Sequence, residues 1–155
     1  MSQGRTYFLG ERLKVKIINK SRHALPAYQT AGAAAFDVCA NIDEPVTLGS
    51  LERALVPTGL YLAVPDGFEA QVRPRSGLAA KHGMGIVNSP GTVDSDFRGE
   101  LKIILVNLSH DEYVVQDGDR IAQVVVAPVE RVQWVEVQVH DTTDRGANGY
   151  GSTGR

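Results

Sequence analysis

The ten residues from Gly91 to Glu100 hold two glycines, three acids, one base and one aromatic residue. If this segment is extended, Asp94 and Asp96 share one face, while Ser95 and Phe97 share the other. One face can then hold a carboxylate against a water molecule, and the other can lay a flat ring against a substrate. A solvated turn with Phe97 in the core is an equally good interpretation. These ten residues alone do not decide between the two.

Three residues at the start of the only predicted helix are suited to an anion. Arg75, Ser76 and Gly77 offer a guanidinium group, a hydroxyl group and the free amides of a helix N-terminus. Ser76 is the predicted N-cap and Gly83 the predicted left-handed end. An ordinary capped helix explains the same residues, so an anion site here needs support from elsewhere in the chain.

The C-terminal segment 141–155 is rich in glycine and carries Tyr150 between two of these glycines. Such a tail cannot bury itself, so we expect it to be mobile on its own. Its arginines and the hydroxyl groups of Ser152 and Thr153 suit phosphate oxygens, and glycines let backbone amides converge on an anion. Simple disorder is the alternative. The composition favours a lid that closes over a phosphate-bearing ligand.

Acidic residues outside the first segment have fewer possible roles. Asp37 stands in an apolar strand, so its carboxylate must be paired, hydrogen-bonded or near a metal. Asp119 and Arg120 are expected to form a surface pair in a turn. The four histidines are widely separated, which predicts no protein-held zinc site. Acids and phosphate-binding groups together suit Mg²⁺ that is held mainly by the phosphates of a ligand, with water as the attacking group.

The elements that must position these residues are mostly short strands. Alternating or apolar runs separated by turn residues predict an all-β, antiparallel sandwich or jelly roll with one short helix. Residues 57–59 interrupt one run and predict an edge or bulge, and a second bulge is expected near Trp134. The predicted strands cover residues 13–18, 36–38, 45–48, 54–64, 68–73, 84–87, 101–108, 113–115, 121–126 and 132–139.

Bulk composition limits the classes of function. A chain of 155 residues fits one domain, with residues 1–11 as an N-terminal extension. A net charge of -2 gives no basic field for nucleic acid or an anionic membrane. The single cysteine, Cys39, cannot form an internal disulfide, which indicates a reducing, cytoplasm-like compartment. No signal core or membrane span is visible, so a soluble protein is expected.

Five stretches, in this order, resemble the motifs of the homotrimeric dUTPase family. They are Ala34–Val38, Pro74–Leu78, Gly91–Glu100, Gly118–Gln123 and Arg145–Gly154. The resemblance implies a jelly-roll (β-clip) trimer whose three active sites each draw on all three subunits. It also implies Mg²⁺-assisted hydrolysis of dUTP to dUMP and pyrophosphate, which limits uracil in DNA and supplies dUMP for thymidylate synthesis.

The resemblance also assigns the nucleoside-binding residues. Asp94 would orient and deprotonate the water that attacks the α-phosphorus, and Phe97, where the family often has Tyr, would leave no room for a 2′-hydroxyl group. Tyr150 would stack on uracil. Uracil would be recognised by Asn88 and by backbone groups of Gly91, Thr92 and Val93.

The phosphates are assigned by the same resemblance. Asp37 would bind a water on Mg²⁺. The phosphate-binding residues would be Arg75, Ser76, Gly77 and Gln123, with Arg145, Ser152 and Thr153 closing on the γ-phosphate. Ala147–Asn148 departs from the small-Gly pair that is usual in the tail, which puts the closure of the lid in question.

Two other classes of protein were weighed against this enzyme. A non-catalytic binding protein on the same scaffold predicts damage to the acid or the tail, yet Asp94, Ser76 and the segment 145–153 are intact. The related dCTP deaminases would need a glutamate base near the helix motif and usually lack this tail. Ammonia release from dCTP would favour them.

Overall fold

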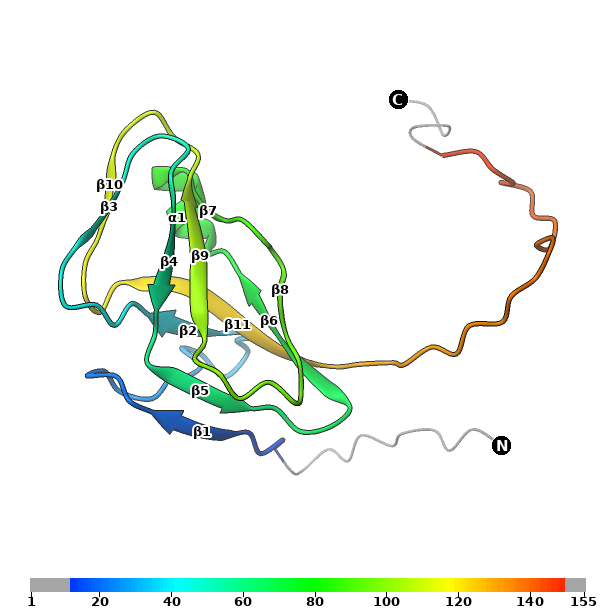
Figure 1. The fold of residues 1–155 in the computed structure, drawn as a ribbon, viewed down its shortest axis with the longest axis horizontal. Helices are drawn as coiled ribbons and strands as arrows, with labels where there is room; N and C mark the ends of the chain where they lie inside the picture. The colour runs from blue at the N-terminus through cyan, green and yellow to red at the C-terminus, as the bar shows by residue number, and fades with distance from the viewer. Residues whose placement is uncertain (1–11, 150–155) are drawn as a thin grey trace.

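The computed structural model describes residues 12–149, and apart from one short helix its regular elements are all β-strands (Figure 1). The all-β, antiparallel architecture with one short helix is confirmed. The helix is α1 (Ser76–His82). The strands are β1 (Lys16–Asn19), β2 (Phe36–Cys39), β3 (Val46–Leu48), β4 (Arg53–Pro57), β5 (Leu60–Ala63), β6 (Phe68–Arg73), β7 (Met84–Ile86), β8 (Gly91–Val93), β9 (Lys102–Asn107), β10 (Tyr113–Val115) and β11 (Arg120–Pro128).

Two sheets enclose the core between them. One has the strand order β2-β11-β6-β8 and the other the order β4-β9-β7, and two-stranded pairs β1-β5 and β10-β3 complete the fold. Along β9 the burial alternates, so Ile103 and Leu105 enter the core together with Val56 of β4 and Val124 of β11. This period-two pattern is the physical reason that the strands were predictable from the sequence.

Two local predictions need correction. The run 54–64 is not one strand with a bulge, because residues 57–59 separate β4 from β5, which belong to different sheets. The edge alternative is confirmed, because β4 lies at the edge of its sheet. The N-cap of α1 is Arg75, with no side-chain cap, rather than Ser76. The helix does end as predicted, at Gly83, whose φ of 64° is in the left-handed region.

The predicted last strand is wrong. Residues 129–139 form no strand within the described part of the chain, and Figure 1 shows them leading away from the sheets. Val129 still donates its amide to Gly67, but the apolar side chains beyond it are exposed, and Trp134 is 88% accessible. Alternation gives a segment the potential to be a strand, yet a strand forms only where a partner completes its backbone hydrogen bonds.

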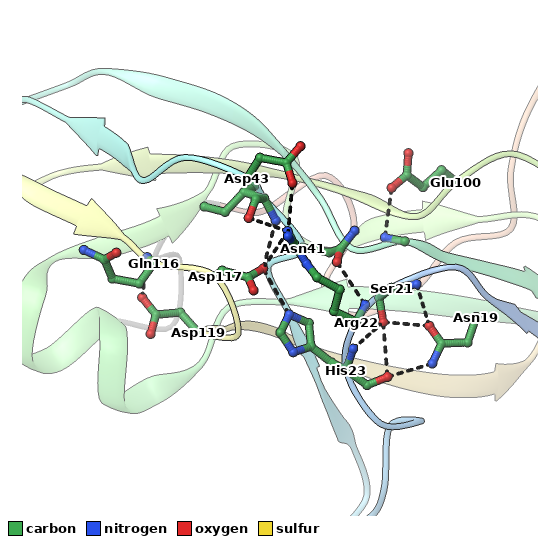
Figure 2. A network of polar contacts seen from close by, with 12 residues as sticks. Asn19, Ser21, Arg22, His23, Asn41, Asp43, Glu100, Gln116, Asp117 and Asp119 are labelled. Atoms are coloured by element: carbon green, nitrogen blue, oxygen red, sulfur yellow. Dashed lines mark hydrogen bonds and ion pairs between the residues drawn. The ribbon is translucent and has the colours of Figure 1, made fainter.

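A polar network fastens the segment after β1 to the body of the fold (Figure 2). Asp117 accepts a hydrogen bond from the amide of Ile42 at 3.0 Å and lies 3.1 Å from Nε2 of His23. Arg22 lies 3.1 Å from Asp43 and donates to the carbonyl of Ile42.

Within residues 12–149, no helix is long and apolar enough to cross a bilayer.

Candidate active site

A pocket of about 190 Å³ lies along strand β8, at the edge of the larger sheet. Because β8 is an edge strand, only one of its sides bonds to β6, and the other side leaves backbone groups free for a ligand. The pocket brings together all six residues predicted near the nucleoside other than Tyr150. These are Asn88, Gly91, Thr92, Val93, Asp94 and Phe97.

The chain turns immediately after β8. The amide of Phe97 donates to the carbonyl of Asp94 at 3.2 Å, so the predicted alternation of Asp94 and Asp96 on one extended face is wrong. The competing interpretation is only half right, because the segment is a turn but Phe97 is 43% accessible and not in the core. Arg98 stabilises the turn by donating to the carbonyls of Ser95 and Phe97.

The Asp94 carboxylate is exposed at the pocket wall. Within residues 12–149, neither a hydrogen bond nor an ion pair holds its side chain. A carboxylate without a protein partner keeps its lone pairs for water, which is what a general base needs.

Asp37 is held in the opposite way. Its two oxygens lie 3.1 Å from Nε of Arg75 and 3.1 Å from Nη1 of Arg120, and its side chain is only 17% accessible. The expectation that this carboxylate must have a partner is confirmed. Pairing with two guanidinium groups stabilises the charge in a strand that is otherwise apolar.

The residues predicted to bind phosphate gather around this cluster. In β11, Gln123 is opposite Asp37 on one side and Arg73 on the other, and its amide donates to the carbonyl of Pro74 at 2.8 Å. Ser76 and Gly77 are exposed at the start of α1. Arg75 uses Nε on Asp37 and Nη1 on the carbonyl of Arg120, which leaves Nη2 without a partner among residues 12–149.

The predicted surface pair of Asp119 with Arg120 is wrong. Asp119 accepts the amide of Gln116, and Arg120 instead crosses to Asp37 on β2. Sequence analysis therefore missed Arg120 as a member of the cluster. The only signal was that Asp37 required a partner. Nearby, Cys39 is half-buried, and this burial raises the pKa of its thiol.

Asp94 and Ser76 lie toward opposite ends of β6, although the β8 pocket itself extends to Val72. Val93, which precedes Asp94, pairs with Ala70, whereas Ser76 lies beyond Arg73 at the far end of the strand. The stretch from Ala70 to Arg73 alone covers about 10 Å, at about 3.3 Å per residue. The pocket around Asp94 accordingly contains none of the phosphate-site residues.

The predicted tail residues are only partly visible. Arg145 donates from Nε to the carbonyl of Asn148 at 2.9 Å, so in this structure it contacts its own segment rather than either site. Tyr150, Ser152 and Thr153 lie outside the described residues, as does the extension 1–11. No group of three or more His, Cys, Asp or Glu side chains suited to a metal occurs between residues 12 and 149.

Comparison with known proteins agrees with this arrangement. The family model described as dUTPase matches residues 13–154. The deoxyuridine 5′-triphosphate nucleotidohydrolase of Fusobacterium nucleatum is 54% identical over 145 residues, which cover 94% of this chain and 99% of the relative. The protein of the same name from Cytophaga hutchinsonii is 56% identical over 141 residues, covering 91% of this chain and 92% of the relative.

The fold is also similar to solved structures. The dUTPase of Staphylococcus bacteriophage 80alpha with dUPNHPP superposes with a TM-score of 0.82 at 22% identity, covering 92% of this chain and 99% of the phage chain. At that identity the likeness concerns the fold alone. The family match over most of the chain and the two close relatives establish membership, and the chain belongs to the dUTPase family.

Proposed function

We propose that this protein hydrolyses dUTP to dUMP and pyrophosphate. The observation that carries the proposal is the pocket along β8, which places an unpaired carboxylate, an aromatic ring and free edge-strand backbone around one space. Asp94 orients and deprotonates the attacking water, and its exposed oxygens support that role. A positioned base and a fixed in-line approach are the chain's main contributions to the reaction at the α-phosphorus.

Uracil and deoxyribose occupy the β8 pocket in this proposal. The free edge of Gly91, Thr92 and Val93 supplies donors and acceptors at fixed spacing, which suits the polar edge of a pyrimidine. Asn88 adds a side-chain amide from the same pocket wall. Phe97 lies against the sugar and excludes a 2′-hydroxyl group.

The triphosphate lies against the cluster around Asp37. Nη2 of Arg75, the hydroxyl of Ser76, the amide of Gly77 and the side chain of Gln123 are suited to its oxygens. The absence of a three-ligand acidic cluster within residues 12–149 fits Mg²⁺ that arrives on the phosphates, where it would neutralise their charge.

Asp37 has room for a role beside that ion. Each of its oxygens accepts from one guanidinium group, and a carboxylate oxygen can accept a second bond, here from a water on the Mg²⁺. Such a contact through water asks for no change in the two ion pairs. A structural Mg(II) ion is named for the dUTPase of phage phi11 of S. aureus.

The tail is the proposed lid. Arg145, Ser152 and Thr153 close on the γ-phosphate and Tyr150 stacks on uracil, which excludes water and completes the site. In the described part of the tail, the self-contact of Arg145 with Asn148 must open before Arg145 can reach a phosphate.

A homotrimer with shared sites would explain why Asp94 and Ser76 lie apart within one chain. The water held by Asp94 must reach the α-phosphorus while Ser76 contacts phosphate oxygens, and a second subunit can bring these groups together. The exposed apolar side chains of the segment 132–139 also support assembly, because a lone chain leaves them in water. A monomer in sedimentation at micromolar concentration would contradict the shared site.

The physiological role follows from the reaction. Removing dUTP limits uracil incorporation into DNA, and the dUMP formed supplies thymidylate synthesis. We place the protein in a cytoplasm-like, reducing compartment. The single cysteine of the chain, half-buried and not in a disulfide, supports that location.

The test measures pyrophosphate release with Mg²⁺ from dUTP, beside dTTP, dCTP and UTP at equal concentration. Release from dUTP alone establishes the reaction and both the base and the sugar preference. No release from any nucleotide points to a binding protein, and a dUTP-binding measurement then decides that case. Ammonia release from dCTP would assign the chain to the deaminases instead.

A further inference from the structure

The turn that carries Phe97 is anchored at both ends. At its start, Val93 pairs with Ala70 of β6. At its end, Glu100 accepts the amide of Gly59 at 2.9 Å, and Leu101 donates to the carbonyl of Leu60 at 2.8 Å (Figure 2 shows the Glu100 contact). The two hydrogen bonds from Arg98 tighten the middle. The backbone of this turn therefore has little freedom to shift.

The position of the Phe97 ring depends on its contact with Gly99. The ring lines the pocket, whereas Gly99 does not. A Cβ atom built on Gly99 would lie 2.5 Å from Cζ and 2.8 Å from Cε2 of Phe97. Carbon atoms in contact usually stay about 3.5 to 4.0 Å apart. The ring thus rests directly on the α-carbon of Gly99, and the residue that carries it lines the pocket.

We propose that Gly99 is a positioning residue for substrate recognition, because its missing side chain sets how far the Phe97 ring projects into the sugar pocket. The inference rests on the proposed function, in which Phe97 lies against the deoxyribose. Any side chain at position 99 displaces the ring by about 1 Å and so changes its contact with the sugar. Gly99 acts only through Phe97 and does not touch the substrate.

The test variant is Gly99→Ala. The φ of Gly99 lies outside the left-handed region, so alanine fits the backbone, and the clash falls on a side chain that can move. The melting temperature should therefore change little. The KM for dUTP should rise about tenfold or more while kcat changes less, because the displaced ring is a binding contact. Gly32→Ala is the matched control, since its methyl group enters open space.

A double-mutant cycle with Phe97→Ala separates this role from a general structural one. Without the ring, the methyl group at position 99 has nothing to displace, so Phe97→Ala and the double variant should have the same KM. Equal KM values for Gly99→Ala and the unmodified protein would overturn the inference, as would a Gly99→Ala effect that persists without the ring. Absence of dUTP hydrolysis in the unmodified protein would instead contradict the proposed function.

Discussion

Asp94 and Asp37 are both conspicuous in the sequence, and the fold treats them in opposite ways. Asp37 is largely buried between Arg75 and Arg120. Asp94 is exposed beside a pocket, with no partner for its side chain among residues 12–149. The first carboxylate is neutralised and fixed by the protein, and the second is left for a ligand.

The difference separates two kinds of contribution to one reaction. The Asp37 cluster organises cations and amides for phosphate, so its loss should affect stability and binding together. The Asp94 pocket adds little to the packing of the fold, so its loss should affect only the chemistry. Experiment can test this difference, because a substitution at Asp37 should change stability and binding, whereas one at Asp94 should change turnover.

The largest effect is expected at Asp94. Asp94→Asn keeps the size of the side chain but removes the base, so turnover should fall by about 10²- to 10⁴-fold while dUTP still binds. The melting temperature should stay unchanged, because the carboxylate has no hydrogen-bond or ion-pair partner to lose within residues 12–149. Pyrophosphate release and equilibrium binding of dUTP measure the two parts. Asp96→Asn, in the same turn, is the control, and near-normal turnover in Asp94→Asn would remove Asp94 from this role.

Truncation after Asp144 tests whether the tail contributes to phosphate binding. The shortened chain should fold and assemble as the full chain does, because no described residue beyond 144 contacts the sheets by a hydrogen bond or an ion pair. Activity should fall strongly, since the proposed lid is gone. Sedimentation checks the assembly and pyrophosphate release the activity. A truncated protein with the full rate would show that the lid is idle.

The two sites also differ in how far the sequence predicts them. The candidate residues of the β8 pocket were predictable because they lie within ten positions of one another, between Asn88 and Phe97. The Asp37 cluster was not, because Arg120 comes from 83 residues away and its register against β2 depends on a strand pairing with an irregularity at this point. Local chemistry is visible in a sequence, whereas a partner brought by sheet register is not.

The errors have the same origin. Residues 132–139 have the alternation of a strand, but no partner for it exists in the described chain. The prediction that Asp94 and Asp96 share one face was wrong, because β8 ends at Val93 and the next residues form a turn. In that turn the amide of Phe97 donates to the carbonyl of Asp94. In both places the side-chain pattern was sound, and the backbone hydrogen bonds decided the structure.

Asp37→Asn tests the second carboxylate of the comparison with Asp94. It leaves Arg75 and Arg120 without an anionic partner, which should lower the free energy of unfolding by about 1 kcal/mol, a figure reduced because Arg120 is half exposed. The concentration of Mg²⁺ needed for half-maximal activity should also rise. Denaturant unfolding and a Mg²⁺ titration measure the two effects.

Asp43→Asn is the matched control for that variant. It breaks a 3.1 Å pair with Arg22 in which the Asp43 side chain is 92% accessible, so the change should stay within about 0.5 kcal/mol. Equal losses in the two variants would mean that the Asp37 cluster is no more than another surface ion pair.

The smallest effect is expected at a third carboxylate, Asp117, which resembles Asp37 in having polar partners but is not among the predicted site residues. The amide of Ile42 and then His23 hold the pKa of Asp117 below its ordinary value of 3.8. A lowered pKa means that the charged form stabilises the fold above the ordinary value, and that this stabilisation is lost as the pH falls through the lowered value. Asp117→Asn should therefore melt slightly below the unmodified protein near neutral pH, and the two should converge as the pH falls from about 3.8 through the lowered pKa of Asp117.

Thermal melting across that pH range measures the effect, and pyrophosphate release at neutral pH should be unchanged. Asp66→Asn is the control, because Asp66 faces only an exposed Arg131 at 3.8 Å. A gap for Asp117→Asn that stays constant with pH would show that hydrogen-bond geometry, not charge, matters there. Lost activity in this variant would mean that the contacts of Asp117, which anchor the segment after β1, also affect the active site.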